Sequence, residues 1–341
     1  MNITEAVARV VEHGDLGRGD MRDVITAIMT GECTPAQIGG FLIAMRMKGE
    51  TVEEITGAAQ AMRELATAVH VDVPHLVDTC GTGGSGKKPF NVSTAAAFVA
   101  AAAGAHVAKH GNRAMSSKSG SADLLEAAGV NIELNPEQVS RCITEVGIGF
   151  MFAPMHHGAM KHAVGPRREL GVRTLFNLVA PLTNPAGATH QLLGVYDRNQ
   201  QRPIAEVLMR LGAQHVLVVH SAEGLDEISI AGPTHVVELK EGKIEEYDIQ
   251  PQDFGVAVHG LETLVCASPQ ESLATVRKAL TEERSAAGSM VALNAGAAIY
   301  AADVCATLSQ GIHMAQDAIS AGLAKERLDE LVRITTLMGE A

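Results

Sequence analysis

The hydrophobic pattern of this chain changes near residue 72, and that change limits the folds it can adopt. Up to that point the pattern is purely helical: Thr34-Pro35 supplies a cap and a first-turn proline, and Thr51 with Glu54 forms a capping box. Beyond it, short strand-like runs alternate with helical segments, the runs being 75–80, 105–109, 149–153 and 215–219. Such alternation predicts βαβ units and a mainly parallel sheet.

We therefore expect an α/β protein with a small all-helical N-terminal domain, residues 1–72, and a larger α/β domain, residues 73–341, with a mainly parallel central sheet. The segment 154–185 is rich in Pro, Arg and His. We expect this segment to fold back onto the N-terminal helices, so that part of 155–190 completes the helical domain.

Composition excludes several classes of protein. The 341 residues carry a formal charge of -12, with 3% aromatic residues and no Trp, which argues against a nucleic-acid groove or a basic membrane-binding face. The longest alanine-rich run, 95–103, is too short to span a bilayer, and the N-terminus lacks the basic and apolar regions of a signal peptide. Five scattered cysteines without Cys-x-x-Cys spacing indicate reduced thiols. We expect a cytoplasmic protein with neither nucleic-acid nor membrane partners.

One window of this acidic chain contains no acidic residue. Between Asp78 and Asp123 lie two glycine-rich stretches, 81–94 and 109–121. Five basic residues occur in the window: Lys87, Lys88, Lys109, Arg113 and Lys118. Exposed acids elsewhere are screened beyond about 8 Å at physiological ionic strength. The window predicts a site for an anion, most simply a small molecule that carries phosphate.

The placement of the glycines suits such a site. The first stretch follows a predicted strand, where open α/β sheets bind ligands, and successive glycines let backbone N–H groups surround phosphate oxygens. Ser93 or Thr94 is expected to cap the next helix, whose N-terminus attracts anions. In the second stretch Gly111 and Gly120 permit tight turns, and a helix is expected to begin near Ala122.

Two familiar motifs match the first stretch only in part. Gly81-x-Gly83-x-x-Gly86 fits a dinucleotide fingerprint, but no acidic residue follows until Asp123. The same glycines with Lys87 fit most of a P-loop, but Lys88 stands where a Ser or Thr binds Mg²⁺. A glycine-rich turn without a ligand remains a further alternative.

Three other groups of residues are candidates for ligand binding. Asp226 and Glu227 follow a buried strand and suit Mg²⁺, although paired surface acids are common. His156-His157 with His162 lack further zinc ligands at suitable spacing, which favours a local or substrate-contacting role. Gly165-Pro-Arg-Arg168 is expected to present guanidinium groups on a loop, either for a carboxylate or for surface ion pairs.

Taken together, these segments resemble the anthranilate phosphoribosyltransferase family over nearly the whole chain. The ordered motifs that carry the resemblance are Gly81-Thr-Gly-Gly84, Asn91-Val-Ser-Thr94, Lys109-His-Gly-Asn-Arg113, Ser119-Gly-Ser-Ala-Asp-Leu-Leu-Glu126, His156-His157, Arg173-Thr-Leu-Phe-Asn177, Pro181-Leu-Thr-Asn-Pro185 and Gly224-Leu-Asp-Glu227. Three positions depart from the family pattern: Ser85, Pro89 and Ala180.

The resemblance implies a phosphoribosyl transfer from phosphoribosyl pyrophosphate to anthranilate in tryptophan biosynthesis, with Mg²⁺ as cofactor and a homodimer formed through the helical domain. It implies that phosphoribosyl pyrophosphate is held by Gly81, Gly84, Ser85, Asn91, Val92, Ser93, Thr94, Lys109, His110, Gly111, Asn112, Arg113, Ala114, Met115, Ser116, Ser117 and Ser121. It places anthranilate at Gly81, Asn112 and Arg167, and Mg²⁺ at Ser93, Asp226 and Glu227.

The chemistry of these substrates predicts how catalysis works. Anthranilate is an aniline whose amine is already neutral at pH 7, so the difficult step is the departure of pyrophosphate. We expect Lys109 to act electrostatically, with no covalent nucleophile, and His110 to be at most a late proton acceptor.

Two other interpretations remain. A pyrimidine nucleoside phosphorylase shares the fold and a similar phosphate loop, but lacks the His-His and Arg-Thr-x-Phe-Asn elements. A non-catalytic relative that binds nucleic acid would need a basic groove, which this acidic chain does not predict.

Overall fold

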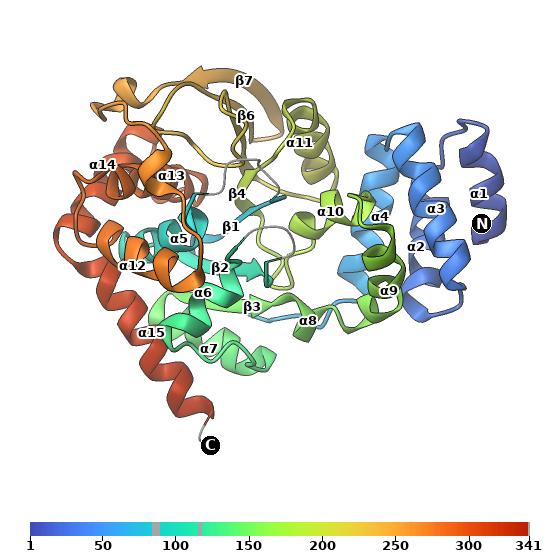
Figure 1. The fold of residues 1–341 in the computed structure, drawn as a ribbon, viewed down its shortest axis with the longest axis horizontal. Coiled ribbons are helices and arrows are strands. Elements are labelled where there is room, and N and C mark those ends of the chain that lie inside the picture. Colours follow the sequence, from blue (N-terminus) through green and yellow to red (C-terminus); the bar gives the residue numbers. More distant parts are fainter. Residues whose placement is uncertain (84–88, 115–117, 340–341) are drawn as a thin grey trace.

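Four helices form the N-terminal part of the protein (Figure 1, blue). In this computed structural model, which describes residues 1–83, 89–114 and 118–339, they are α1 Ile3–Val11, α2 Arg18–Thr30, α3 Pro35–Lys48 and α4 Val52–Glu64. Thr34 caps α3 in a capping box with Gln37, and Thr51 caps α4 in one with Glu54. Both predicted helix starts are confirmed.

A seven-stranded sheet forms the centre of the remaining described residues, in the order β3-β2-β1-β4-β5-β6-β7. The strands are β1 Leu76–Gly81, β2 His106–Gly111, β3 Ile148–Phe152, β4 His190–Gly194, β5 His215–Ser221, β6 Thr234–Lys240 and β7 Lys243–Ile249. Strands β1 to β5 pair in parallel, whereas β6 and β7 pair antiparallel. The prediction of a helical part and a mainly parallel sheet is confirmed.

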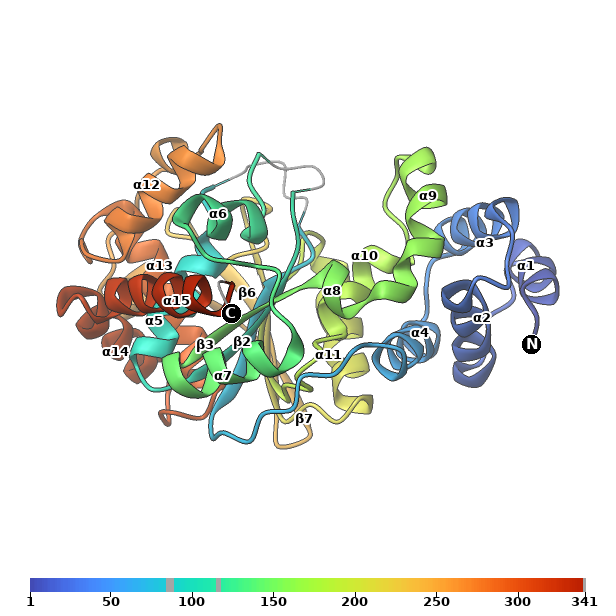
Figure 2. The ribbon, with the colours of Figure 1, turned by 90° about the horizontal axis from the view of Figure 1, so that it is seen from below.

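Helices lie on both faces of this sheet, with α5 and α13 on one face and α11 on the other. The described helices that follow α4 are α5 Val92–Ala102, α6 Ser121–Ala128, α7 Pro136–Val146, α8 Ala153–His156, α9 Lys161–Leu170, α10 Leu175–Val179, α11 Gln201–Arg210, α12 Pro269–Ala279, α13 Ala286–Ala301, α14 Leu308–Ser320 and α15 Leu323–Gly339. Figure 2 shows α5, α13, α14 and α15 gathered on one side, away from the N-terminal helices.

The side-chain alternation of the strands divides the core in two. On β4, Leu192 packs into the cluster that contains α5 and α13, while its neighbour Leu193 packs into the cluster that contains the N-terminal helices. The same alternation separates Leu217 from Val218 on β5. Successive strand residues point to opposite faces, so the continuous apolar runs of these strands serve two cores at once.

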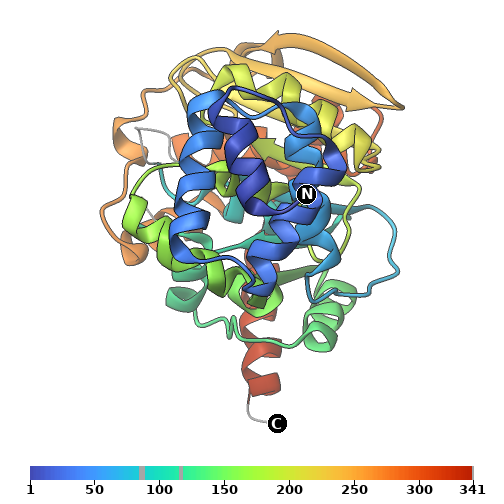
Figure 3. The ribbon, with the colours of Figure 1, turned by 90° about the vertical axis from the view of Figure 1, so that its right-hand side faces the viewer.

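The segment after β3 joins the two parts of the molecule. Helix α9 packs against α2 and α3, and α10 packs against α3 and α4. In Figure 3 the blue helices α1 to α4 lie in front, with green helices of this segment beside them. The domain limits of 1–72 and 73–341 remain a proposal, because Leu175 and Leu193 share one buried cluster with α1 to α4.

Two local expectations are wrong. The N-cap of α5 is Asn91, so Ser93 and Thr94 lie inside the first turn. The stretch Gly165–Arg168 is helical, because α9 continues through Pro166. Pro166 is buried, and packing of α9 against α2 and α3 stabilises a helical turn that proline alone would disfavour. None of the helices in the described ranges has the length and apolar character needed to cross a bilayer.

Candidate active site

The carboxyl ends of the parallel strands bring most of the described candidate residues to one edge of the sheet. Gly81 ends β1, and Gly111 ends β2 two residues after Lys109. Asp226 and Glu227 follow β5, and Ser93 lies in the first turn of α5. This is the edge at which open α/β folds bind ligands.

Lys109 is the central cation of this edge. Its side chain is buried, with 2% exposure, and Nζ donates to the carbonyl oxygen of Thr79 at 2.5 Å and lies 3.4 Å from Ser93 Oγ. Burial lowers the pKa of Lys109, and the nearby carboxylates of Asp78 and Glu227 oppose that shift. A buried ammonium group next to a helix N-terminus forms a strong site for phosphate.

Asp78 lies beneath Lys109 as a buried acidic group. It accepts a hydrogen bond from the backbone N–H of His110 at 3.3 Å. Burial raises the pKa of Asp78, while Lys109 lowers it. The two residues therefore partly compensate the cost of burying each other's charge.

Asp226 contacts the start of the first glycine stretch. Its Oδ2 accepts a hydrogen bond from the backbone N–H of Gly83 at 2.9 Å. A Cβ at Gly81 would lie 2.8 Å from that oxygen, and one at Gly194 would lie 1.7 Å from the backbone oxygen of Asp226. Gly194 therefore needs glycine, because the backbone of Asp226 leaves no room for a Cβ, whereas a Cβ at Gly81 would require the Asp226 carboxylate to shift.

Glu227 completes an oxygen-rich set of possible metal ligands. Burial and the neighbouring charge of Asp226 raise the pKa of Glu227 to about 8, against the influence of Lys109 and a hydrogen bond from the Ser93 backbone. Two carboxylates and the Ser93 hydroxyl are hard oxygen donors, and the raised pKa shows that a nearby positive charge would stabilise the ionised pair. The residues present therefore fit Mg²⁺.

The second glycine stretch is fastened to α6. Asp123 Oδ2 accepts hydrogen bonds from the backbone N–H groups of Ala114 and Gly120, and the Arg113 guanidinium binds Glu126 and contacts Asp123 at 3.5 Å. Ser121 donates to the carbonyl oxygen of Asn112 at 3.3 Å. The Arg113 charge that sequence reasoning assigned to the substrate is thus already paired with two acids.

Asn91 joins the two stretches. Its side-chain oxygen accepts hydrogen bonds from the hydroxyls of Ser119 and Ser272, and its Nδ2 donates to the carbonyl oxygen of Ser119 at 3.2 Å. Val92 is buried in the hydrophobic core. The Thr94 Oγ1 is also buried and has no hydrogen-bond partner among the described residues. Gly84, Ser85, Met115, Ser116 and Ser117 lie outside the described residues.

Two histidines lie side by side near Lys109. The rings of His110 and His157 have centroids 5.0 Å apart. Burial lowers the pKa of His110 well below its ordinary value and that of His157 to about 4, so both are uncharged at pH 7. His110 Nε2 is buried and has no partner within the described ranges. His162 lies elsewhere, against Gly31, so the three histidines do not gather as a zinc site would require.

Arg167 lies on α9, with its guanidinium carbon 5.3 Å from the centre of the Phe176 ring. Burial lowers the pKa of Arg167, and no carboxylate of the described residues lies within 4.0 Å of it. A half-buried guanidinium group without an acidic partner is suited to a ligand carboxylate.

Sequence reasoning gave no role to Arg173 or Tyr196. The guanidinium carbon of Arg173 lies 3.6 Å from the centre of the Tyr196 ring, and its Nη2 donates to the carbonyl oxygen of Gly83 at 2.9 Å. The available signal was the arginine of the Arg-Thr-Leu-Phe-Asn motif.

Two of the three positions that depart from the family pattern lie in the described residues. Pro89 forms an isolated bridge with Val265, and Ala180 is exposed at the start of a short 3-10 helix.

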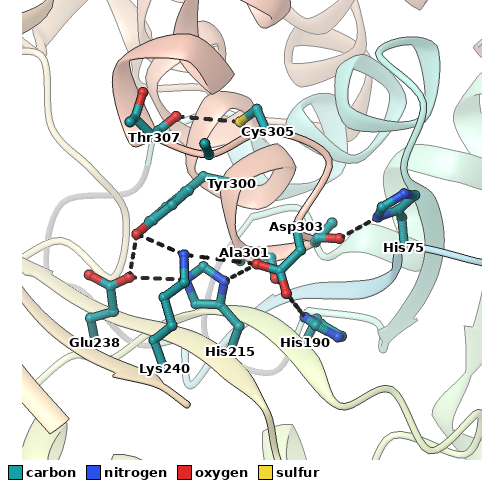
Figure 4. Close-up of polar contacts among 12 residues, drawn as sticks. His75, His190, His215, Glu238, Lys240, Tyr300, Ala301, Asp303, Cys305 and Thr307 are labelled. Carbon is teal, nitrogen blue, oxygen red and sulfur yellow. Dashed lines mark hydrogen bonds and ion pairs between the residues drawn. The ribbon is translucent and has the colours of Figure 1, made fainter. Parts of the chain in front are cut away.

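A second group of titratable residues lies at the opposite edge of the sheet (Figure 4). Among the described residues, His190, His215 and Asp303 are close enough to suggest a metal site. However, His190 Nδ1 lies 2.8 Å from the carbonyl oxygen of Ala301 and His215 Nδ1 lies 2.7 Å from Asp303 Oδ1. These contacts join the starts of β4 and β5 to the C-terminal end of α13. There the His190 ring satisfies a helix-end carbonyl group, and the His215 ring contacts the Asp303 carboxylate. The group is a structural anchor.

Glu238 makes this anchor sensitive to acid. Although burial opposes the shift, hydrogen bonds from His215, Tyr247 and Tyr300 lower the pKa of Glu238 to about 2. Its folded pKa lies below the unfolded value, so its contribution to stability is present above about pH 4.5 and lost as the pH falls toward 2.

We therefore expect Glu238→Gln to lower the free energy of unfolding at pH 7 by about 1–3 kcal/mol. The difference from wild type should shrink between about pH 4.5 and pH 2, while both substrate KM values stay unchanged. Urea unfolding at several pH values measures this difference in the free energy of unfolding. The control is Glu245→Gln, on the exposed neighbouring strand β7. A difference that did not depend on pH would contradict this role.

Comparison with known proteins identifies the family. Residues 4–66 match the helical bundle domain of a glycosyl transferase family, and residues 73–325 match the a/b domain of the same family. The anthranilate phosphoribosyltransferase of Azotobacter vinelandii (strain DJ / ATCC BAA-1303) is 60% identical, over 99% of this chain and 98% of its own. That of Hahella chejuensis (strain KCTC 2396) is 58% identical over 100% of this chain and 99% of its own.

Solved structures agree with these relatives. The crystal structure of anthranilate phosphoribosyltransferase from Thermus thermophilus has 44% identity and a TM-score of 0.92, covering 97% of this chain and 99% of that one. The Saccharomyces cerevisiae enzyme in complex with PRPP and Mg has 25% identity and a TM-score of 0.89, with 98% of both chains covered. The chain therefore belongs to this glycosyl transferase family and, within it, to the anthranilate phosphoribosyltransferases.

Proposed function

We propose that the protein transfers the phosphoribosyl group of phosphoribosyl pyrophosphate to the amine of anthranilate, giving N-(5-phosphoribosyl)anthranilate and pyrophosphate. The observation that carries the proposal is the buried Lys109 at the strand ends, next to the α5 N-terminus and across from an acidic pair. Family membership supports the assignment, since this activity is named for relatives that align with nearly the whole chain.

The pyrophosphate end of the substrate is assigned to the two glycine stretches. Lys109, the first turn of α5 and the backbone of residues 109–114 supply positive charge and N–H donors for the phosphates. These groups stabilise negative charge as it develops on the leaving pyrophosphate, and they are already positioned before the reaction begins. Ser121 and the other predicted contacts complete this set.

Mg²⁺ is assigned to Asp226, Glu227 and Ser93. When bound, the ion supplies positive charge that neutralises phosphate oxygens of the substrate. Because Asp226 also accepts a hydrogen bond from Gly83, the acidic pair links this position to the first glycine stretch.

Replacing Asp226 and Glu227 together with Asn and Gln is expected to raise the Mg²⁺ concentration for half-maximal turnover at least about tenfold, because two anionic oxygen ligands are lost. Initial rates across a Mg²⁺ titration measure the effect, and Glu223→Gln, on the same loop, is the control. An unchanged titration curve would remove the acidic pair from this role.

Anthranilate is assigned to Arg167, Asn112 and Gly81. The Arg167 guanidinium has no acidic partner among the described residues and suits the anthranilate carboxylate. The uncharged His110 ring adds an Nε2 that likewise has no partner in these ranges. The amine nitrogen forms a bond to the anomeric carbon as the bond from that carbon to the pyrophosphate oxygen breaks. The attack leaves the nitrogen as a positively charged anilinium, which then loses a proton to water. No strong base is needed, because an anilinium is acidic.

The reaction is tested by the loss of anthranilate fluorescence. We expect the signal to fall only when phosphoribosyl pyrophosphate and Mg²⁺ are both present. Turnover of a pyrimidine nucleoside with phosphate, and none of anthranilate, would overturn the proposal in favour of the phosphorylase.

We also propose that two copies of the chain associate through the helical part. Val11, Ile43, Met47 and Leu170 line an apolar hollow of ≈ 510 Å³ on α1, α3 and the end of α9, with Met47 78% exposed. A contiguous exposed apolar surface is typical of an interface.

We propose a cytoplasmic location for the protein, which is supported by its cysteines being free thiols.

Met47→Glu is expected to convert the dimer to a monomer, because a charge would be buried in an apolar contact. Size-exclusion chromatography with light scattering measures the mass, and Val258→Glu, exposed on the α/β part, is the control. A wild-type protein that is monomeric at micromolar concentration would refute the proposed interface.

A further inference from the structure

The start of the first glycine stretch is held on both sides by the sheet edge. The backbone N–H of Thr82 donates to the carbonyl oxygen of Gly194 at 2.9 Å, and the backbone N–H of Tyr196 donates to Thr82 Oγ1 at 3.1 Å. The N–H of Gly83 donates to Asp226 Oδ2 at 2.9 Å. These three bonds come from the ends of β4 and β5, which form the α/β side of the site.

Arg173 adds a contact from the other side of the site. It lies between α9 and α10, and its Nη2 donates to the carbonyl oxygen of Gly83 at 2.9 Å. With Asp226 on its N–H and Arg173 on its carbonyl oxygen, the Gly83 residue has both backbone polar groups occupied by charged side chains. Gly83 has a φ of +65°, which glycine adopts without strain.

The Tyr196 ring fixes the plane of this guanidinium. The guanidinium carbon of Arg173 lies 3.6 Å from the ring centre, well within the range of a cation–π contact. Since the backbone of Tyr196 also binds Thr82, the ring that orients Arg173 belongs to the same framework as the stretch that Arg173 contacts. Arg173 lies within 4.0 Å of no carboxylate in the described ranges, so its charge is not neutralised there by an ion pair.

The second terminal nitrogen of Arg173 strengthens the case. Nη1 is buried and has no hydrogen-bond partner among the residues described. An unsatisfied buried donor is costly, so such groups in native proteins usually serve a purpose. Here the donor belongs to a cation located beside a predicted phosphate site.

The position of Arg173 also connects the two parts of the molecule. Helices α9 and α10, which flank it, pack against α2, α3 and α4. The bond from Arg173 to Gly83 therefore joins the helical part directly to the first glycine stretch.

We propose that Arg173 is a positioning residue for phosphoribosyl pyrophosphate. It fixes Gly83 and holds beside the glycine stretch a positive charge that no carboxylate of the described residues neutralises. The proposal rests on the proposed function, because it takes that substrate as the anion. Arg173 acts on the phosphate-binding side only, and so it should separate the two substrates in kinetic measurements.

Arg173→Ala is expected to raise the KM for phosphoribosyl pyrophosphate at least about tenfold and to change the KM for anthranilate less than about twofold. Arg173→Lys should be intermediate, since lysine keeps the charge but not the planar stacking. The control is Arg141→Ala, an exposed arginine of α7 that pairs with Glu145, and it should change neither KM. An equal rise in both KM values, or no rise, would overturn the proposal.

A second pair of variants tests the same contact through its ring. Tyr196→Phe keeps the ring under Arg173 and should behave like wild type, whereas Tyr196→Leu removes the ring and should raise the KM for phosphoribosyl pyrophosphate several-fold. Equal KM values in these two variants would overturn the proposal even if Arg173→Ala failed to fold.

A binding measurement separates this proposal from the proposed function. Calorimetric titration with phosphoribosyl pyrophosphate and Mg²⁺, without anthranilate, should show tight binding to wild type and weaker binding to Arg173→Ala. If wild type bound the compound but transferred nothing to anthranilate, the proposed function would fail while the role of Arg173 stood. Equal binding by both proteins would refute the role of Arg173.

Discussion

Lys109→Met is expected to lower kcat about 10²–10³-fold, the loss typical of removing one preorganised group that stabilises charge in a transition state. The lysine is buried at the end of β2 and supplies a full positive charge where the leaving pyrophosphate is assigned. The charge on that group grows as its bond to the ribose breaks, so the interaction strengthens toward the transition state. Methionine has a similar length and so preserves packing, but it removes the positive charge next to the buried Asp78.

Steady-state kinetics at saturating substrates measure this loss. Lys161→Met, an exposed lysine at the start of α9, is the matched control and should retain wild-type kcat. Thermal unfolding of each variant checks that the fold is intact. A folded Lys109→Met enzyme within about threefold of the wild-type rate would exclude the electrostatic role of Lys109.

Arg167→Ala should raise the KM for anthranilate about 10–100-fold and leave the KM for phosphoribosyl pyrophosphate nearly unchanged. The expected size is that of a charge-assisted, bidentate bond between a guanidinium group and a carboxylate. Because no carboxylate of the described residues pairs with Arg167, its loss leaves no acid among them unpaired.

The comparison is made with initial rates at varied anthranilate. Arg168→Ala, the exposed neighbour on α9, serves as the control, and Arg167→Lys should recover part of the affinity. If both KM values rose equally in Arg167→Ala, the carboxylate would have to bind elsewhere.

Much of the fold could be predicted from local signals. The caps at Thr34 and Thr51 are short-range patterns, and each begins a helix in the structure. The antiparallel strands β6 and β7 were not predicted. Charged residues such as Lys243 and Glu245 leave β7 largely exposed, whereas β6 is largely buried and this reason does not apply to it. A half-solvated edge strand gives a weaker hydrophobic signal than a buried one.

The residues of the candidate site could be predicted from the sequence, but the hydrogen bonds and ion pairs between them could not. The absence of acids between Asp78 and Asp123 pointed to an anion site whose metal ligands must come from elsewhere, and Asp226 contacts Gly83 in the structure. That Arg113 is paired with Glu126 could not be foreseen, because the pairing depends on how the second stretch turns back onto α6. The roles of the individual site residues remain predictions.

The central claim is that charges held at the strand ends promote a direct transfer between two substrates bound together, without a covalent intermediate. The most direct test is the initial rate of anthranilate fluorescence loss over a grid of both substrate concentrations, at saturating Mg²⁺. We predict reciprocal plots that intersect, as a complex containing both substrates requires. Parallel lines, together with exchange of labelled pyrophosphate into phosphoribosyl pyrophosphate in the absence of anthranilate, would instead show a covalent ribosyl-enzyme and contradict the account.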